Sequence, residues 1–472
     1  MTALMVQGVS SWSGKSLITT ALAGALHRRG IDVVPFKAVN MSNNARVVDG
    51  GEIGTAQYLQ ALAAGVAPNV RMNPVLVKPE GERRSQVVVL GRPDLELSRR
   101  PWRERPAELW PVIERALSEL LASHELVLIE GAGSPAEINL RDTDLANMRT
   151  AAFAGADVLL VADIDRGGAF AHLYGTWALL AEDERARIRW FVLNKFRGDP
   201  ALLPPAPERL RELTGVPTLG VLPWLEHALP DEDGAAEAGG SDGGERAVAV
   251  IRYPTASNLD EFKPLEQLGV LRWATEPSQL TGARLVVLPG SKHVAADLAW
   301  LLRSGLASAL RERAASGLPV LGICGGLQML GGHVRDEAGV DGSAPGLGLL
   351  AIETAFDAVK RTERTEAVFA TLAEPWAGLS GLPIAGYEIR HGVSRPIGAV
   401  APALPDGLGY VAGPVLGIYL HGLFESPGLV LALLGEAPQR SLEQALVELA
   451  DAAERHLDVD ALLARAPAAV AR

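Results

Sequence analysis

Cysteine is almost absent from this sequence: Cys324 is the single one among 472 residues. One thiol cannot form an internal disulfide or build a cluster of thiolate metal ligands. Aromatic residues are also scarce, at 5%, whereas hydrophobic residues make up 48% of the chain. That content is ample for large cores and excludes a disordered chain. Cys324 is therefore either an incidental core residue or a chemical reagent.

The sequence also lacks an excess of positive charge. Its 44 basic and 56 acidic residues give a formal net charge of −12, which argues against a nucleic-acid-binding protein. No apolar run reaches the roughly 18 residues that span a bilayer. The run Ala3–Val6 is strand-like and no basic segment precedes it. We therefore expect a cytoplasmic protein that binds neither nucleic acid nor membrane.

Short apolar runs of strand length recur along the chain, and several are followed by turn residues and a helical pattern. In the N-terminal half they are Ala3–Gln7, Val33–Lys37, Leu126–Glu130, Asp157–Asp163, Trp190–Asn194 and Thr218–Leu222. In the C-terminal half they are Ala247–Tyr253, Arg284–Pro289, Pro319–Ile323, Leu349–Glu353 and Leu416–His421. Alternating strands and helices predict two α/β modules with mostly parallel sheets.

One stretch divides the two modules. Pro230–Gly244 has no apolar periodicity and is dominated by Asp, Glu, Gly and Ala, as is typical of a linker. We therefore expect domains at residues 1–229 and 246–472, joined by a linker at 230–245. Residues 440–464 have a helical pattern, and we expect this tail to pack on the second domain.

The turn after the first strand has the features of a phosphate-binding loop. It reads Gly8-Val-Ser-Ser-Trp-Ser13-Gly14-Lys15-Ser16 and opens the best helix pattern, 16–29, although the usual motif has four residues between its glycines and this one has five. Backbone N–H groups there would bind an anion, Lys15 would neutralise the β- and γ-phosphates of ATP, and Ser16 would ligate Mg²⁺. The alternative is an ordinary strand–helix turn with a surface lysine.

A magnesium ion also needs carboxylates. Glu130 ends a predicted parallel strand, where α/β sheets bind their ligands, and Asp49 and Glu52 lie at a Gly-rich turn. We predict all three, with Ser16, as metal ligands. The alternatives are a helix cap or loop charge for Glu130 and a common Asp-Gly turn for Asp49.

Two further segments are rich in polar residues and follow predicted strands. We predict that they bind the substrate, through Glu137, Asn139, Arg141, Asp142, Asp144, Asp165 and Arg166. A solvated loop network is the alternative. Asn194 closes another strand, and we expect its amide to read the adenine of ATP.

Cys324 lies in Gly322-Ile-Cys-Gly-Gly326, between an apolar strand and a helical pattern. A nucleophile elbow has this form, and the helix start lowers the pKa of a thiol there. The N–H group of Gly325 would supply half of an oxyanion hole, and Gly290 could supply the other half. The alternative is a small buried hydrophobic residue.

A thiol nucleophile needs a base, and His421 fits best among the nine histidines. It ends the apolar run 416–420 and precedes a glycine, so it can reach a nucleophile at a neighbouring strand end. The alternative is a hydrogen-bonded histidine with no catalytic role.

Taken in order, these and neighbouring segments resemble the cobyric acid synthase family. The resemblance covers nearly the whole chain and rests on Phe36-Lys37 with Asn40-Met41, Asp49–Gly54, Met72–Pro79, Glu130–Arg141, Asp163–Gly168, Asn194–Gly198, Leu288–Lys292, Gly322–Gly326 and Tyr419–Gly422. It implies a P-loop-type domain of the dethiobiotin synthetase kind, followed by a flavodoxin-like class I glutamine amidotransferase domain. It also implies that Asn40 binds the substrate.

The resemblance implies a reaction as well. L-Glutamine and ATP would amidate four peripheral carboxylates of a corrinoid, adenosylcobyrinic acid a,c-diamide, to give adenosylcobyric acid in cobalamin synthesis. Cys324 and His421 would release ammonia, and a substrate acyl phosphate would accept it.

The sequence departs from the expected motifs at three places. Class I glutaminases usually carry a glutamate two residues after the histidine, where this chain has Leu423, although Glu425 is nearby. Trp12 lies in the phosphate loop, and Arg390 replaces a histidine before His391. The resemblance therefore favours a Cys–His dyad.

Two rival functions stay open at this stage. Cobyrinic acid a,c-diamide synthase shares both chemistries but amidates two other carboxylates; Asp49–Gly54 and Glu130–Arg141 favour the first family. A partition-type P-loop switch is a rival of another class, and it has no use for a Cys324–His421 pair.

Overall fold

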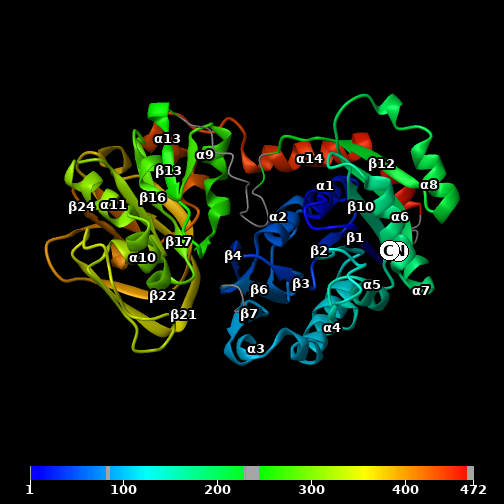
Figure 1. The fold of residues 1–472 in the computed structure, drawn as a ribbon, viewed down its shortest axis with the longest axis horizontal. Coiled ribbons are helices and arrows are strands. Elements are labelled where there is room, and N and C mark those ends of the chain that lie inside the picture. Colours follow the sequence, from blue (N-terminus) through cyan, green and yellow to red (C-terminus); the bar gives the residue numbers. More distant parts are fainter. Residues whose placement is uncertain (1, 81–84, 228, 230–243, 465–472) are drawn as a thin grey trace.

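The computed structural model describes residues 2–80, 85–227, 229 and 244–464. Each half of the chain contains one large sheet covered by helices (Figure 1). The predicted fold class, two successive α/β modules with mostly parallel sheets, is confirmed.

The N-terminal half is built on a six-stranded sheet in which all neighbours are parallel. In spatial order its strands are β12 (Thr218–Pro223), β11 (Ile188–Phe196), β10 (Asp157–Asp163), β1 (Ala3–Gly8), β9 (Leu126–Glu130) and β2 (Val33–Phe36). All six were predicted. The strands on one side of β1 precede those on the other side in the chain, and such switch points are where open α/β sheets bind ligands.

Both faces of this sheet are buried, as a parallel sheet requires. Along β1, Ala3 and Met5 contribute to the hydrophobic core on one face, whereas Leu4 and Val6 contribute to the core on the other. The first face is covered by α4 (Pro106–Ser123), α5 (Met148–Ala154), α6 (Ala169–Leu179) and α8 (Ala206–Thr214), and the second by α1 (Lys15–Arg28) and α2 (Thr55–Ala63). Two short helices, α3 (Leu95–Arg99) and α7 (Glu182–Arg185), complete this half.

Small sheets that the sequence did not predict lie between this domain and the C-terminal half. They are β3 (Val39–Met41), β6 (Val75–Pro79), β7 (Ser85–Val89) and β8 (Arg92–Asp94), and a hairpin of β4 (Ala45–Val48) and β5 (Gly51–Gly54). Val47 and Leu76 from these strands pack against Tyr387 and Ile389 of the C-terminal half. The small sheets therefore form part of the contact between the two halves.

The C-terminal half is built on a seven-stranded sheet. Its spatial order is β15 (Leu271–Ala274), β13 (Val248–Ile251), β16 (Leu285–Leu288), β18 (Val320–Ile323), β25 (Val415–Ile418), β24 (Gly409–Ala412) and β23 (Ala401–Leu404). The first five are parallel and the last two antiparallel. The helices of this half are α9 (Lys263–Gln267), α10 (Val294–Arg303), α11 (Leu306–Ala315), α12 (Gly325–Leu330) and α13 (Pro427–Leu434).

One predicted strand of the C-terminal half was wrong. Residues 349–353 do not join the central sheet; a strand begins at Ile352 and continues as β21 (Ile352–Val368), which pairs antiparallel with β22 (Pro383–Pro396). Much of β21 is exposed. A strand of the parallel sheet would be buried on both faces, so this long hairpin is a separate structure.

The predicted location of the C-terminal tail was also wrong. The tail is helical, as α14 (Leu442–His456) and α15 (Val459–Leu463), but α14 lies along α1 of the N-terminal half (Figure 1). Ala445, Leu449 and Ala453 join the hydrophobic core beneath α1, and Arg29 forms an ion pair with Glu454 at 2.5 Å. The apolar stripe of this helix covers the first sheet.

Most of the predicted linker, residues 230–243, lies outside the described residues; Gly244 opens a short 3₁₀ turn, Gly244–Arg246. None of the helices in the described part of the chain has the length and apolar character needed to cross a membrane.

Candidate active sites

The phosphate loop connects β1 to α1 at the switch point of the first sheet. Gly14 has φ 94°, and a Cβ there would lie 2.0 Å from Nδ2 of Asn194. A Cβ on Gly8 would lie 2.1 Å from Oγ of Ser13. Both positions therefore need glycine, because any side chain would open the loop.

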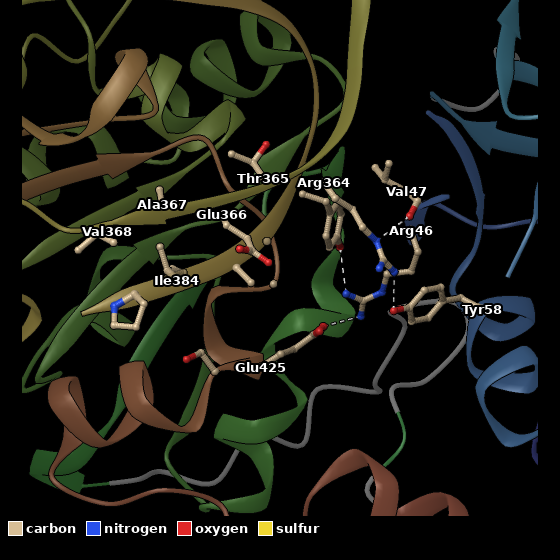
Figure 2. Close-up of a pocket in the computed structure, with 16 residues that line it drawn as sticks. Arg46, Val47, Tyr58, Arg364, Thr365, Glu366, Ala367, Val368, Ile384 and Glu425 are labelled. Carbon is tan, nitrogen blue, oxygen red and sulfur yellow. Dashed lines mark hydrogen bonds and ion pairs between the residues drawn. The ribbon is translucent and has the colours of Figure 1, made fainter. Parts of the chain in front are cut away.

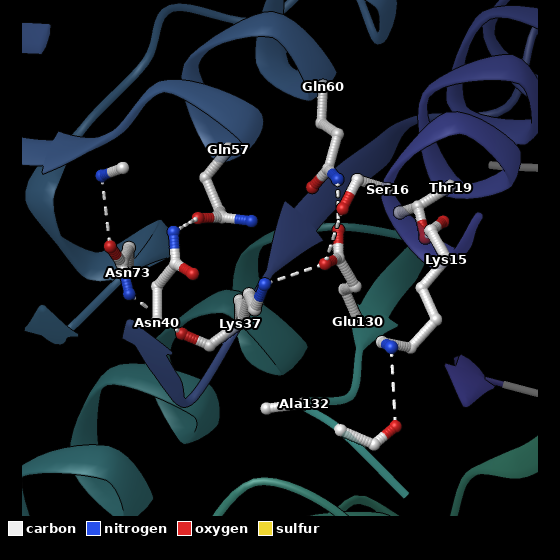
Figure 3. Close-up of polar contacts among 12 residues, drawn as sticks. Lys15, Ser16, Thr19, Lys37, Asn40, Gln57, Gln60, Asn73, Glu130 and Ala132 are labelled. Atoms are coloured by element: carbon white, nitrogen blue, oxygen red, sulfur yellow. Dashed lines mark hydrogen bonds and ion pairs between the residues drawn. The ribbon is translucent and has the colours of Figure 1, made fainter. Parts of the chain in front are cut away.

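Glu130 lies at the centre of a polar cluster beside this loop (Figure 3). Its side chain is fully buried, and its Oε1 accepts hydrogen bonds from Ser16 Oγ at 2.9 Å and from Lys37 Nζ at 2.7 Å. Gln60 donates to the other carboxylate oxygen. The first turn of α1 and the ends of β2 and β9 thus bring a hydroxyl, an ammonium and a carboxylate to one place.

Lys15 reaches across the same loop. Its Nζ donates to the carbonyl oxygens of Ser10 at 3.0 Å and Gly133 at 3.2 Å. The predicted pair of Lys15 and Ser16 therefore stands beside Glu130, on the side where the helix N-terminus favours an anion.

Ser16 and Glu130 suit a magnesium ion. Mg²⁺ takes oxygen ligands and commonly binds one or two carboxylates together with substrate phosphates and water. Across the described ranges no group of three or more His, Cys, Asp or Glu residues could hold a metal by itself. The donor set, one hydroxyl and one carboxylate, therefore fits a metal that arrives with a nucleotide.

Asp49 and Glu52, the other predicted metal ligands, are not part of this cluster. Asp49 is exposed at a tight turn with φ 50°. Glu52 is fully buried, and its two carboxylate oxygens contact Lys78 and Lys360. Burial alone would raise the pKa of Glu52, but Lys360, Lys78 and Lys292 outweigh it and hold that pKa far below its ordinary range. Lysines engage both carboxylate oxygens of Glu52, and Glu52 lies outside the Ser16–Glu130 cluster, so its assignment as a ligand of the same metal is corrected.

Asn194 also has a position that differs from the expected one. It is fully buried behind the phosphate loop, and its Nδ2 donates to the carbonyl oxygen of Ser13 at 2.9 Å. The amide nitrogen therefore supports the loop, whereas Oδ1 is buried with no hydrogen-bond partner in the described part of the chain, and a role of this amide in reading adenine stays a prediction.

A cavity of about 530 Å³ opens next to the phosphate loop. Trp12, Lys15, Asn40, Glu137 and Asp144 line it. Burial raises the pKa of Asp144, and Oδ1 of Asn40 is buried with no hydrogen-bond partner in the described part of the chain. This cavity brings together three of the predicted substrate residues.

The remaining predicted substrate residues do not line that cavity. Arg141 pairs with Glu184 at 2.7 Å, Asp165 pairs with Arg197 at 3.2 Å, and Arg166 lies 3.6 Å from Asp163. These three residues, together with Asn139 and Asp142, are exposed and lie on loops outside the cavity.

Cys324 occupies the turn between β18 and α12 in the second sheet. Its φ of 51° and ψ of −104° are strained for a residue with a side chain, as is common at functional sites. The N–H group donates to the carbonyl oxygen of Ile418 at 2.7 Å, which holds the turn in place. The thiol faces a small cavity of about 90 Å³.

His421 follows β25, the neighbour of β18, and it is buried beside Cys324. Burial disfavours the imidazolium, but hydrogen bonding and charge from Cys324 and Glu261 outweigh it and raise the pKa of His421 to about 10. A protonated imidazole next to a thiol stabilises the thiolate.

Glu261 completes this group, and the sequence did not reveal it. Its Oε1 lies 2.9 Å from Nδ1 of His421, and its Oε2 accepts the N–H group of Gly422 at 3.0 Å. Leu423, where the motif has its glutamate, is buried, and Glu425 pairs with Arg46. Glu261 is 160 residues upstream of His421, so no local spacing could have identified it.

Of the predicted oxyanion residues, Gly325 directly follows Cys324 and Gly290 lies against His421. A Cβ on Gly290 would lie 2.7 Å from Cε1 of His421, and a Cβ on Gly325 would lie 2.7 Å from the backbone nitrogen of Ser291. The two glycines therefore allow the strand end and the elbow to approach each other closely.

His391 and Arg390 border the same small cavity. His391 Nδ1 lies 3.0 Å from the carbonyl oxygen of Asp357, and burial lowers the pKa of this histidine. Arg390 donates to Glu388 and stacks on Tyr419. Both residues are therefore part of the wall of the small cavity.

Comparison with known proteins gave two family matches that divide the chain in the same order. Residues 4–233 match the CobQ/CobB/MinD/ParA nucleotide binding domain, and residues 247–428 match the CobB/CobQ-like glutamine amidotransferase domain.

Curated relatives match over nearly the whole length. A protein named cobyric acid synthase from Polaromonas naphthalenivorans is 54% identical, covering 96% of this chain and 97% of the relative. Proteins of the same name from Paracidovorax citrulli and Variovorax paradoxus are 56% and 53% identical, over 92% and 97% of this chain and 92% and 98% of their own.

Proposed function

The chain belongs to the cobyric acid synthase family, and from that premise we propose the reaction that it catalyses. It is an amidating enzyme of cobalamin biosynthesis with a nucleotide-binding domain and a glutamine amidotransferase domain. We propose that it amidates the b, d, e and g carboxylates of adenosylcobyrinic acid a,c-diamide, using ATP, Mg²⁺ and L-glutamine.

The amidotransferase half would release ammonia. The Cys324 thiolate attacks the amide carbon of glutamine, and His421 gives a proton to the departing ammonia. The resulting glutamyl thioester is hydrolysed by water, which returns the thiol and releases glutamate. Glu261 accepts a hydrogen bond from His421 Nδ1 and so holds the other ring nitrogen toward the thiol. Gly290 and Gly325 would supply the N–H groups that stabilise the developing oxyanion.

The N-terminal half would activate the carboxylate. A substrate carboxylate oxygen attacks the γ-phosphorus of ATP, ADP leaves, and an acyl phosphate forms; ammonia then attacks the acyl carbon and phosphate leaves. Lys15 neutralises the phosphates, and Ser16 and Glu130 are the residues that would hold Mg²⁺, which when bound supplies further positive charge there. Asn40, Glu137 and Asp144 line the cavity in which the carboxylate would be presented.

The observation that carries this proposal is the occurrence of both groups in one chain: Cys324–His421–Glu261 and Lys15–Ser16–Glu130. The domain division proposed is 1–229 for the synthetase and 246–472 for the amidotransferase, with the C-terminal helices returning to the synthetase side.

Two variants test the division of labour. Cys324→Ala should abolish glutamine-dependent amidation and keep amidation driven by ammonium chloride. Ser16→Ala should lower ammonia-dependent amidation roughly 100-fold and keep glutamine hydrolysis. Product mass after incubation with adenosylcobyrinic acid or with its a,c-diamide separates this reaction from that of the a,c-diamide synthase. Equal loss of both activities in either variant would contradict the proposal.

A further inference from the structure

Arg46 is a buried arginine of the N-terminal half that contacts the glutaminase site of the other half. It lies on β4, and its side chain is only 7% exposed. Its Nη2 lies 2.5 Å from Oε1 of Glu425 (Figure 2). The same nitrogen lies 2.7 Å from Oδ2 of Asp260, and Nη1 donates to the Tyr387 hydroxyl at 3.3 Å. One guanidinium therefore connects three side chains of the C-terminal half.

Two of these partners, Asp260 and Tyr387, adjoin the group around His421. Asp260 directly precedes Glu261, whose carboxylate hydrogen-bonds His421. The Tyr387 ring stacks on the His421 ring, with centroids 5.4 Å apart and planes inclined by 23°. The two residues also exchange backbone hydrogen bonds, at 2.9 and 3.2 Å. Arg46 therefore contacts both the residue that precedes Glu261 and the tyrosine whose ring stacks on His421.

Neighbours of Arg46 hold the same segment. Thr55 donates to Oδ2 of Asp260 at 3.0 Å, and Oδ1 of Asn44 accepts the N–H group of Leu259 at 3.1 Å. The short segment that carries Glu261 is therefore fastened to the N-terminal half at several points.

We propose that Arg46 is a positioning residue for the glutaminase reaction: through Asp260 and Tyr387 it aligns Glu261 and His421, so that glutamine hydrolysis depends on the docked synthetase domain. The inference rests on the proposed glutaminase function. Arg46 touches neither substrate nor thiol in this role; it acts through the residues that face His421, which are Cys324, Glu261 and Tyr387.

A second arginine at this interface provides a matched control. Arg364 reaches in the opposite direction, from β21 to the N-terminal half, and donates to Val47 O at 3.3 Å and to the Tyr58 hydroxyl at 2.8 Å (Figure 2). It lines the same interdomain cavity, of about 900 Å³, and its backbone is the ladder partner of Tyr387 between β21 and β22, but neither of these two side-chain hydrogen bonds goes to Asp260 or Tyr387. Loss of Arg364 removes interface contacts without releasing the segment that carries Glu261.

The test measures glutamine hydrolysis by the full-length chain in Arg46→Ala, Arg46→Lys, Asp260→Asn and Arg364→Ala. We expect Arg46→Ala and Asp260→Asn to lower kcat about 10- to 100-fold with KM for glutamine within about twofold, since a small misalignment of catalytic groups has effects of that size. Arg46→Lys should recover part of the loss, and Arg364→Ala should stay within about twofold of the parent. Ammonia-dependent amidation should be retained by all four.

Cys324 allows a second readout that needs no turnover. Because it is the single cysteine, the rate of alkylation by iodoacetamide reports the thiolate directly. In Arg46→Ala the alkylation rate at neutral pH should fall, whereas Arg364→Ala should follow the parent. Equal effects of Arg46→Ala and Arg364→Ala on kcat and on alkylation would overturn the positioning role. A parent protein without glutamine hydrolysis would instead overturn the proposed function.

Discussion

At the scale of single residues, Glu261 is the main addition to the predicted site. The carboxylate of Glu261 adds to the effect of Cys324 in raising the pKa of His421, and its hydrogen bond to Nδ1 orients the imidazole, which a Cys–His dyad alone would have to achieve by packing. The turn after the histidine has Leu423 where the motif has a glutamate. The glutamate beside His421 comes instead from another element, the 3₁₀ turn Leu259–Phe262.

Replacement of Glu261 by glutamine should alter the pH dependence of glutamine hydrolysis. The carboxylate contributes to raising the pKa of His421 to about 10, so its loss lowers that pKa. The alkaline fall of kcat/KM, where the imidazolium loses its proton, should then move to lower pH. We expect kcat to fall about 100-fold.

The pH profiles of glutamine hydrolysis by the parent and by Glu261→Gln check this prediction. Glu266→Gln, a half-exposed glutamate nearby that pairs with Lys263, is the control and should keep the parent profile. An unchanged alkaline limb in Glu261→Gln would show that Glu261 does not act on His421.

At the scale of elements, α14 is the helix whose position matters most. Gly24 on α1 has no side chain, so α14 can pack close to it. A Cβ at this position would lie 2.9 Å from Cβ of Ala450. Arg28 and Arg29 pair with Asp451 and Glu454 along the same contact. The C-terminal helix therefore stabilises the helix that follows the phosphate loop.

A valine at Gly24 should push α14 away from α1. Overpacking of this kind costs about 1–3 kcal/mol in the free energy of unfolding. The double variant Gly24→Val with Ala450→Gly should be less destabilised than the sum of the two single variants, because the glycine restores space. Thermal unfolding of the four proteins measures this coupling, and strict additivity would argue against the close contact.

At the scale of the whole molecule, buried ion pairs join the two halves. Glu52 of the synthetase half contacts Lys78 of the same half and Lys360 of the amidotransferase half, and all three are nearly or fully buried. Its lowered pKa means that the carboxylate is charged throughout the physiological range. The stabilisation is present above the ordinary carboxyl pKa and is lost only when the pH falls toward the lowered value.

Glu52→Gln should destabilise the protein because it leaves buried ammonium groups without their counterion. Removal of one partner of a buried pair costs about 3–5 kcal/mol. Urea denaturation of the variant measures the loss, and adding Lys360→Met should recover part of it. A loss no larger than that of an exposed pair, as in Glu363→Gln, would contradict the buried role of Glu52.

Much of this protein could be predicted from local sequence patterns. Parallel strands buried on both faces are continuous apolar runs, and the phosphate loop and the Cys324 elbow need glycines at fixed positions, so both features can be recognised within a few residues. Strand ends further placed Glu130 and His421 at the correct edges of their sheets. These inferences depend on neighbours in sequence, which is why they succeeded.

Only the tertiary structure decided the features that depend on contacts between distant segments. Glu261 meets His421 across 160 residues, Glu52 is neutralised by Lys360, and α14 packs on α1 after the chain has passed through the other half. The charge of a carboxylate predicts that it needs a partner, but not whether that partner is a metal, a lysine or a histidine. The sequence by itself therefore determined which chemical groups stand at each strand end. The fold decided which of these groups meet. The physical reason is that a buried charge is stable only beside a counterion or hydrogen-bond partner, and that partner can come from a distant segment.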